Sequence, residues 1–293
     1  MFTHSVVSYP DRGTHGDNKY RGNCTGYIVR DFVKTYMKHE KALFADPSIG
    51  GGTSQDVAQE LGVRFKGTDL RDGFNLLTDS FGEFLGEEAQ TIWWHPPYWD
   101  MIKYSGNQWG EANKWDLSQM GLNDFVESLE VALMNIHDAT EKGGHYGILM
   151  GNLRRKGQYF NLSSLVERVA PAPLVDEIIK TQHNCVSDGR SYARNIVRIA
   201  HEKLLVFRRG NAGSLQFLMV AHNRAGSLIG TTWRAAIRRT MQGKTMSLAQ
   251  LYEALKSYAT TRENSHWQAQ IRKIVQDDRY FVRVSKGVYK LAT

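Results

Sequence analysis

The chain has 293 residues, of which 41% are hydrophobic and 23% charged, and its formal net charge is +7. This apolar content excludes an intrinsically disordered chain, and no apolar run approaches the roughly 20 residues that span a bilayer. Two cysteines exclude a disulfide framework and a cysteine-rich zinc site, and the first residues lack the apolar region of a secretory signal. We therefore expect one or two soluble domains in a reducing, cytoplasmic compartment.

Positive charge is concentrated in the last part of the chain. Residues 1–210 contain 24 Lys and Arg against 26 Asp and Glu, a net charge of −2, whereas residues 211–293 contain 13 against 4, a net charge of +9. Such an asymmetry indicates an appendage that binds a polyanion beside a nearly neutral body. A small domain with a charged, solvated surface would show the same composition, and this alternative stays open here.

Strands and helices alternate along the first 210 residues. This alternation predicts an α/β fold with a largely parallel sheet, in which the last strands can include an antiparallel edge pair. We expect helices at 25–39, 54–61, 121–142 and 162–169, and strands at 42–45, 63–70, 91–94, 145–150, 174–182 and 197–207.

The C-terminal residues follow a different pattern. Apolar residues recur at helical spacing over 247–259 and 264–277, and short strands are expected at 280–284 and 287–291. Two helices followed by a hairpin are the outline of a winged helix. The predicted domains are residues 1–210 with the main sheet, 211–246 as a linking segment, and 247–293 as a small, basic, winged-helix-like α+β domain.

A glycine-rich turn joins the first predicted buried strand to the next helix. The segment Asp46-Pro47-Ser48-Ile49-Gly50-Gly51-Gly52-Thr53 lets the backbone approach a ligand closely, and the helix that follows offers free N–H groups. It is neither a dinucleotide-binding fingerprint nor a P-loop. Asp69 ends the following strand, where a carboxylate can accept both hydroxyls of a ribose. Together they favour a nucleoside site over a tight turn without a ligand.

The tetrapeptide His95-Pro96-Pro97-Tyr98 ends another buried strand, at the edge where open α/β sheets bind ligands. Two consecutive prolines remove two hydrogen-bond donors, so the Pro96 carbonyl can point into a pocket. Tyr98 offers an aromatic face on which a base can stack. An acceptor at position 95 and the Pro96 carbonyl could take both hydrogens of an exocyclic amine, which makes its nitrogen nucleophilic. For such a tetrapeptide seen alone, a proline-stiffened turn is the alternative.

These segments resemble motifs of the S-adenosylmethionine-dependent DNA amino-methyltransferases, which methylate adenine N6 or cytosine N4. Residues 46–53 resemble the cofactor turn of this family, Asp69 its acidic position and 95–98 its catalytic tetrapeptide. The resemblance covers about residues 10–210. It extends to three further segments, namely 21–26, 151–157 and 201–207.

The resemblance implies a Rossmann-like class I methyltransferase sheet flanked by helices, followed by the winged-helix-like domain. It also implies S-adenosylmethionine as the methyl donor, S-adenosylhomocysteine as the product, and no metal. The catalytic residues would be His95, Pro96, Pro97 and Tyr98. The cofactor would be held by Asn23, Cys24, Thr25, Asp46, Pro47, Ser48, Gly50, Gly52, Thr53, Asp69, Leu70 and His95.

Two features depart from the family pattern. The first tetrapeptide residue is usually Asp, Asn or Ser, whereas here it is His95, whose neutral ring accepts a hydrogen bond only at the nitrogen that carries no proton. We expect adenine N6 as the target, with cytosine N4 as the alternative. The chain also lacks a large recognition insert before residue 210. We therefore expect weak or short sequence specificity, with groove contacts from loops near 99–118, 152–160 and 183–195.

The implied partner is duplex DNA with one base flipped out of the stack, and not a membrane. The enzyme would be bacterial or phage-encoded and nucleoid-associated, a homodimer is compatible with the sequence, and a nuclease partner is left open. RNA amino-methylation and a non-enzymatic DNA-binding regulator are the alternatives. Cys24 and Cys185 are interpreted as packing residues. Candidate DNA contacts are Lys103, Tyr104, Ser105, Arg154, Arg155, Lys156, Arg238, Arg239, Lys244, Arg272, Lys273, Arg283 and Lys286.

Overall fold

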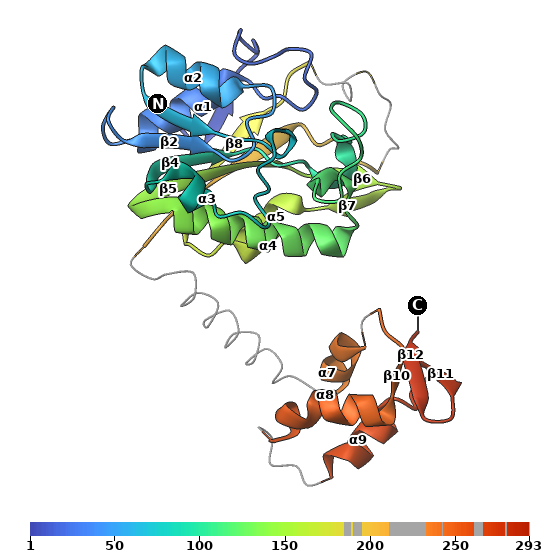
Figure 1. The fold of residues 1–293 in the computed structure, drawn as a ribbon. Helices are drawn as coiled ribbons and strands as arrows, with labels where there is room; N and C mark the ends of the chain where they lie inside the picture. Colours follow the sequence, from blue (N-terminus) through green and yellow to red (C-terminus); the bar gives the residue numbers. More distant parts are fainter. Residues whose placement is uncertain are drawn as a thin grey trace. The chain divides into compact units, whose positions relative to one another are not determined.

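The computed structural model describes residues 1–184, 189, 195–210, 233–241, 243–260, 266–278 and 280–292. The chain divides into two units, residues 1–217 and 218–293, each with its own hydrophobic core (Figure 1). Among the described residues, no helix combines the length and the apolar character needed to span a bilayer.

The first unit is built on a seven-stranded sheet. The strand β9 runs antiparallel to both of its neighbours, β5 and β8, and every other pair in the sheet is parallel. The predicted α/β fold with a mostly parallel, Rossmann-like sheet flanked by helices is therefore confirmed. In sheet order the strands are β1 (Val6–Ser8), β8 (Leu174–Thr181), β9 (His201–Arg208), β5 (Thr140–Gly151), β4 (Ala89–Trp94), β2 (Leu43–Asp46) and β3 (Arg64–Gly67).

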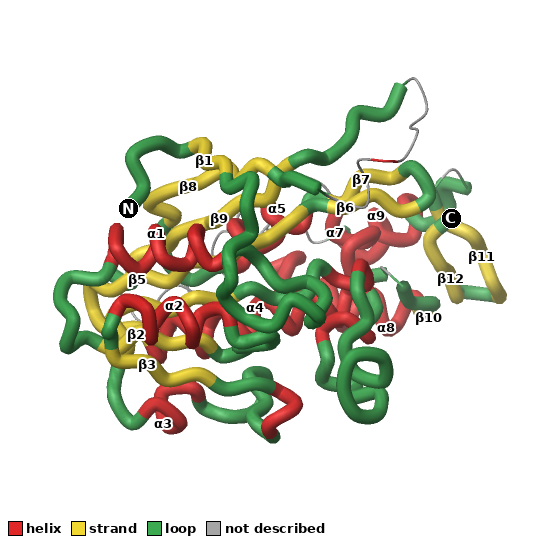
Figure 2. Tube along the Cα trace, turned by 90° about the horizontal axis from the view of Figure 1, so that it is seen from above, coloured by secondary structure: helices red, strands yellow, loops and turns green. Residues whose placement is uncertain are grey.

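Helices cover both faces of this sheet. On one face lie α1 (Gly26–Tyr36) and α2 (Thr53–Leu61), and in Figure 2, which looks down on this layer, both helices lie in front of the strands. On the other face lie α3 (Phe81–Leu85), α4 (Leu122–Ala139) and α5 (Leu162–Val169) (Figure 1). Strands covered on both faces are apolar at consecutive positions, which explains why β4 reads as a continuous buried run.

The order of the strands creates a switch point between β2 and β4. From β2 the chain crosses through α2 to β3 on one side, and it then returns to β4 on the opposite side of β2. Adjacent strands whose connections leave in opposite directions open a crevice at their carboxyl ends. The glycine-rich turn follows β2 and the tetrapeptide follows β4, so both predicted segments begin at this crevice.

Short elements were not evident from the sequence. They include β1, α3 and a hairpin formed by β6 (Leu153–Arg155) and β7 (Gln158–Phe160). Strands of three residues are too short to establish an alternating pattern. The helix predicted over 121–142 also ends earlier, at Ala139, because Thr140 is already the first residue of β5.

The second unit contains three helices and a three-stranded antiparallel sheet of order β10-β12-β11 among its described residues. Its core includes Trp233, Ile237 and Met241, so residues 233–241 belong to this unit, although the sequence had placed them in a linking segment over 211–246. Residues 211–232 of that segment lie outside the described part. The elements are α7 (Trp233–Thr240), β10 (Met246–Ser247), α8 (Leu248–Thr260), α9 (Trp267–Ile274), β11 (Phe281–Ser285) and β12 (Val288–Leu291).

Candidate active site

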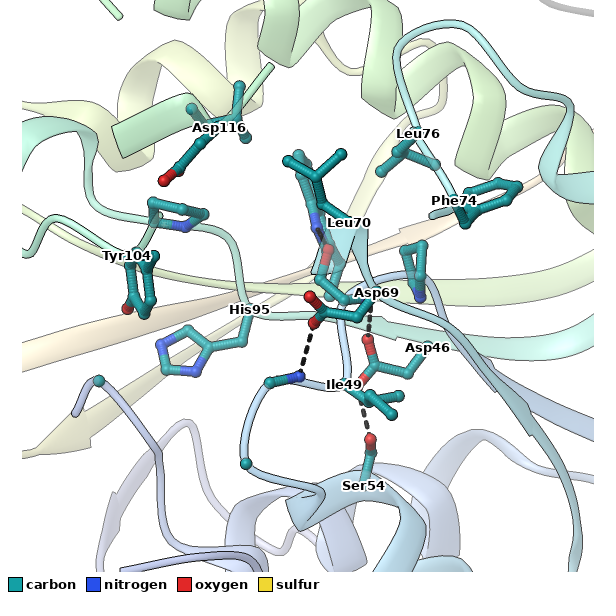
Figure 3. A pocket seen from close by; sticks show the side chains of 18 of the residues that line it. Asp46, Ile49, Ser54, Asp69, Leu70, Phe74, Leu76, His95, Tyr104 and Asp116 are labelled. Atoms are coloured by element: carbon teal, nitrogen blue, oxygen red, sulfur yellow. Dashed lines mark hydrogen bonds between the residues drawn. The ribbon is translucent and has the colours of Figure 1, made fainter. Parts of the chain in front are cut away.

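A cavity opens at the carboxyl ends of β2, β3 and β4. It is partly open to solvent and is lined by both polar and apolar residues. Its walls come from the glycine-rich turn, from Asp69, from the tetrapeptide and from a later loop that carries Tyr104 and Asp116 (Figure 3). The predicted cofactor turn, acidic position and tetrapeptide thus meet in one place.

Asp46 holds the glycine-rich turn in shape. One carboxylate oxygen accepts a hydrogen bond from the Ser48 N–H at 2.8 Å, and the other accepts one from the Ser54 hydroxyl at 2.5 Å. The side chain thereby ties the end of β2 to the first turn of α2. Burial raises the pKa of Asp46 to about 7, and the nearby carboxylate of Asp69 acts in the same direction. Because these two bonds join the end of β2 to the start of α2, we assign Asp46 to positioning the turn.

Asp69 keeps hydrogen-bonding capacity toward the cavity. Its oxygens accept from the N–H of Gly50 at 2.9 Å and from the N–H of Arg71 at 3.2 Å, where it caps the 3₁₀ helix Leu70–Asp72. A carboxylate can accept about four hydrogen bonds, so about two positions remain for a ligand. Burial raises the pKa of Asp69. Hydroxyl donors from a ligand would offset that loss of solvation.

The cavity has two chemically different ends on either side of Asp69. Figure 3 shows the side chains of Phe74 and Leu76 toward one end, and those of Tyr104 and Asp116 toward the other. Asp116 is buried, and it accepts hydrogen bonds from the N–H and the hydroxyl of Ser105 at 2.8 and 2.7 Å. An apolar end, a central carboxylate and a polar, aromatic end suit an elongated ligand with an apolar ring at one end, hydroxyl groups in the middle and a polar tail.

A second cavity lies on the other side of the tetrapeptide. Its walls include Pro96 and Tyr98, the start of the β6–β7 hairpin with Arg154, and Glu202 of β9. Four residues line both cavities, namely Gly22, Asn23, His95 and Tyr104. The His95 ring therefore stands where a ligand in the first cavity and a ligand in the second could meet.

The tetrapeptide is held by hydrogen bonds between side chains. His95 Nε2 lies 2.9 Å from the hydroxyl of Tyr98, and that hydroxyl donates to Glu202 at 2.8 Å. Burial lowers the pKa of His95 to about 4, so the ring is neutral at neutral pH. Burial acts to raise the pKa of Glu202, but the charge of Lys180 at 2.7 Å, the His95 ring and the hydrogen bonds from Lys180 and Tyr98 together outweigh it and lower that pKa.

Most of the predicted cofactor residues line the first cavity, and two do not. Thr25 caps α1, and its hydroxyl donates to the carbonyl of Arg12 at 2.8 Å, so it is engaged away from the cavity. Gly52 supplies the left-handed N-cap of α2, with a φ of 84°. The thiol of Cys24 is buried and its pKa is raised to about 12 by burial, which fits a packing role in the wall. The predicted residues at the cavity are Asn23, Cys24, Asp46, Pro47, Ser48, Gly50, Thr53, Asp69, Leu70 and His95.

The predicted DNA contacts of the first unit fall into different environments. Ser105 is buried against Asp116 and is not available to a partner, which corrects that expectation. Lys103 donates to the carbonyl of Ser118, and Arg155 pairs with Asp100 at 2.9 Å. Arg155 also lines the second cavity, as do Tyr104 and Arg154, and Lys156 is exposed at the turn of the β6–β7 hairpin. Cys185 and most of the predicted contact loop 183–195 lie outside the described residues.

The basic residues predicted in the second unit are mostly at its surface. The Arg238 guanidinium lies over the ring of Tyr280, 5.4 Å from its centroid. The side chain of Arg239 lies outside the described part of the chain. The other candidates, Lys244, Arg272, Lys273, Arg283 and Lys286, are exposed.

Several residues of the site had not been singled out from the sequence, including Phe74 and Leu76 at the apolar end of the first cavity. Tyr20 stacks on Tyr104 with ring centroids 5.8 Å apart, and Asp116 closes the polar end of the first cavity. Lys180 and Glu202 lie opposite each other on β8 and β9. Opposite charges in two neighbouring strands were a signal, but their pairing depends on a register that the sequence does not state.

No family model matches the chain, and no curated protein sequence matches it. Solved structures with some similarity include TrmN from Thermus thermophilus (13% identity, TM-score 0.36, 65% of this chain and 51% of that chain). Two others are a protein provisionally called a DNA modification methylase, also from Thermus thermophilus (15%, 0.31, 59% and 54%), and an rRNA methylase from Streptococcus thermophilus (8%, 0.33, 63% and 95%). The chain spans about half the length of the first two.

Proposed function

We propose that the first unit is a methyltransferase that uses S-adenosylmethionine to methylate the exocyclic amine of a nucleobase. The observation that carries the proposal is the meeting of two cavities at His95 and Tyr104. The first cavity has the hydrogen-bonding groups and apolar wall that a nucleoside with a polar tail needs. The second cavity is wide and has basic residues at its wall. A transfer reaction needs two ligands whose reacting atoms meet, and this arrangement provides that.

The residues of the first cavity fit S-adenosylmethionine. Asp69 has acceptor positions left for the two ribose hydroxyls, and Leu70 and Phe74 offer an apolar wall to the adenine ring. The glycine-rich turn packs closely against the segment that carries Asn23: a methyl group added at Gly51 would lie only 2.9 Å from the Asn23 amide nitrogen. When bound, S-adenosylmethionine supplies a methyl group already activated by a sulfonium sulfur.

The tetrapeptide orients the target amine. A neutral His95 ring would accept one amine hydrogen, and the carbonyl of Pro96, which lines the second cavity, would accept the other. With both hydrogens held, the lone pair of the nitrogen is withdrawn from conjugation with the base and becomes available as a nucleophile. Catalysis by orientation and hydrogen bonding is sufficient for a donor that is already activated.

We further propose adenine N6 of duplex DNA as the target, with the base flipped out of the stack. An exocyclic amine within a stacked duplex cannot reach a buried pocket, so the base must leave the helix to enter the second cavity. Arg154 at that cavity and the exposed cations of the second unit supply positive charge for a phosphate backbone. The winged-helix outline of the second unit supports a duplex over a single strand.

Radiolabelled methyl transfer to a panel of nucleic acids tests the proposal. Duplex DNA, single-stranded DNA and RNA should be compared, followed by mass spectrometry of the nucleosides. We expect label on duplex DNA as N6-methyladenine. Label on N4-methylcytosine or on RNA would change the target, and no label on any of them would reject the transferase.

Calorimetry with S-adenosylmethionine tests the first cavity by itself. Asp69→Asn should weaken binding, by roughly tenfold for each hydroxyl that loses a charged acceptor. Asp72→Asn is the matched control, because Asp72 is an exposed carboxylate on the same 3₁₀ helix. Equal affinities of the two variants would remove Asp69 from the site, and an absence of binding in the natural protein would favour a non-enzymatic regulator.

A further inference from the structure

A buried ion pair stands behind the tetrapeptide. Lys180 of β8 and Glu202 of β9 are register partners, and the Lys180 Nζ lies 2.7 Å from one carboxylate oxygen of Glu202. The two side chains are only 12% and 10% exposed. The other oxygen of Glu202 accepts the hydroxyl of Tyr98 at 2.8 Å, and Tyr98 in turn lies 2.9 Å from His95 Nε2. Four side chains thus form one chain of contacts.

The direction of each hydrogen bond in this chain follows from counting protons. Glu202 is ionised beside Lys180, so it can only accept. The single proton of the Tyr98 hydroxyl is therefore committed to Glu202. The contact between Tyr98 and His95 then needs its proton from the ring, which places a hydrogen on Nε2. A neutral imidazole carries one hydrogen, so Nδ1 is left with a lone pair.

We infer that Lys180 and Glu202 are positioning residues that set the tautomer of His95 through Tyr98, so that Nδ1 is the nitrogen that accepts the target amine. This inference rests on the proposed function, because it concerns how the same site receives its substrate. It gives the Tyr98 hydroxyl a role in addition to the proposed stacking of its ring on the base. It also explains why Nδ1 of His95 would be an acceptor, although a neutral imidazole can carry its hydrogen on either nitrogen.

Removal of the ion pair should reverse the direction of the hydrogen bond between Tyr98 and His95. Without an acceptor at position 202, the Tyr98 hydroxyl donates to Nε2 of His95, and the ring hydrogen moves to Nδ1. A donor at Nδ1 faces the donor hydrogens of the amine, and the two repel. The fold should survive this change, since a buried ion pair can be replaced by apolar residues of similar size with little loss of stability.

The test compares the natural protein with the double variant Lys180→Met/Glu202→Leu. Nitrogen-15 NMR of the histidine rings reports the tautomer directly, and a His95→Gln sample identifies the His95 signals. We expect the Nε2–H form in the natural protein and a shift toward the Nδ1–H form in the double variant. Methyl transfer should fall roughly 100-fold while the affinity for S-adenosylmethionine stays unchanged.

Two further variants separate positioning from a general structural effect. Lys180→Met/Glu202→Gln keeps an acceptor oxygen at position 202 and should restore most of the Nε2–H form and of the activity. Glu177→Gln breaks the neighbouring ion pair with Lys203, which joins the same two strands at 2.9 Å, and should alter neither readout. An Nε2–H tautomer that persists in the Leu variant would overturn the inference and leave the proposed function intact. If the natural protein transferred no methyl group, the proposed function would fall, and the NMR result would still decide the tautomer.

Discussion

At the scale of single residues, His95 carries the proposed chemistry. His95→Ala should lower kcat by at least about 100-fold, a usual contribution of a positioned hydrogen-bonding side chain, and leave binding of S-adenosylmethionine unchanged. Burial lowers the pKa of His95 to about 4, and only the neutral ring can accept. Activity of the natural protein should therefore fall as the pH drops through about 4, without a step near 6.5 that belongs to this ring. Stopped-time assays across the acidic and neutral range check both points, and a His95→Ala variant as active as the natural protein would exclude the role.

Asp46 makes a prediction about stability rather than activity. Its pKa is raised to about 7 by burial, whereas the unfolded chain has a value near 3.9. Between these values the folded state binds more protons than the unfolded state, so this residue's contribution to stability is lost as the pH rises toward 7. Asp46→Asn carries no titrating proton. The free energy of unfolding of this variant minus that of the natural protein should therefore increase as the pH is raised from about 4 to about 8, by up to about 4 kcal/mol.

Urea unfolding without ligand at several pH values measures this difference. Asp72→Asn serves as the comparison, because the carboxylate of Asp72 is exposed whereas that of Asp46 is buried. If the difference in unfolding free energy between Asp46→Asn and the natural protein did not change with pH, burial would not raise the pKa of the Asp46 carboxyl. The measurement needs no assumption about substrate.

At the scale of elements, the end of β5 supports the tetrapeptide. A methyl group added at Gly151 would lie 2.5 Å from the Tyr98 ring, closer than carbon atoms approach, so Gly151→Ala must displace that ring. We expect roughly a 100-fold loss of methyl transfer with cofactor binding retained, since a small misplacement near the reacting atoms is enough. Gly147→Ala is the control on the same strand: it meets Phe32 at 2.6 Å, within the core. It should lower thermal stability and leave kcat unchanged, and equal kcat values for the two variants would argue against this support.

The longer elements could be predicted from the sequence because each has a pattern of its own. The buried run of β4, the apolar spacing of α4 and the glycine-rich turn before α2 all fall close to their predicted places. The turn, Asp69 and the tetrapeptide could be assigned to one crevice because parallel strands present their carboxyl ends at one edge. The ion pair of Lys180 and Glu202 could not, because it depends on the antiparallel register of β8 and β9. The β6–β7 hairpin was missed because its strands have only three residues each.

At the scale of the whole molecule, the proposed active site and the excess positive charge lie in different units. The first unit, residues 1–217, holds both cavities, and all of the excess positive charge lies in the second. The second unit has a core of its own around Ile237, Leu251 and Ile271, so its surface can change without disturbing the sheet of the first. Binding and transfer should therefore respond to different substitutions.

Arg272 and Lys273 of α9 are the substitutions that test this division, because both side chains are exposed at the end of one helix. If each contacts a phosphate, the double variant Arg272→Ala/Lys273→Ala should weaken DNA binding and reduce the slope of log K against log salt by about 2. At saturating DNA, kcat should remain that of the natural protein.

Lys142→Ala provides the control, since Lys142 is exposed near the start of β5, away from the strand's Gly151 end at the second cavity. Fluorescence anisotropy over a range of salt concentrations gives the slopes. The same slope in the natural protein, the double variant and the control would mean that α9 does not contact the backbone, and that the charge of the second unit serves another purpose.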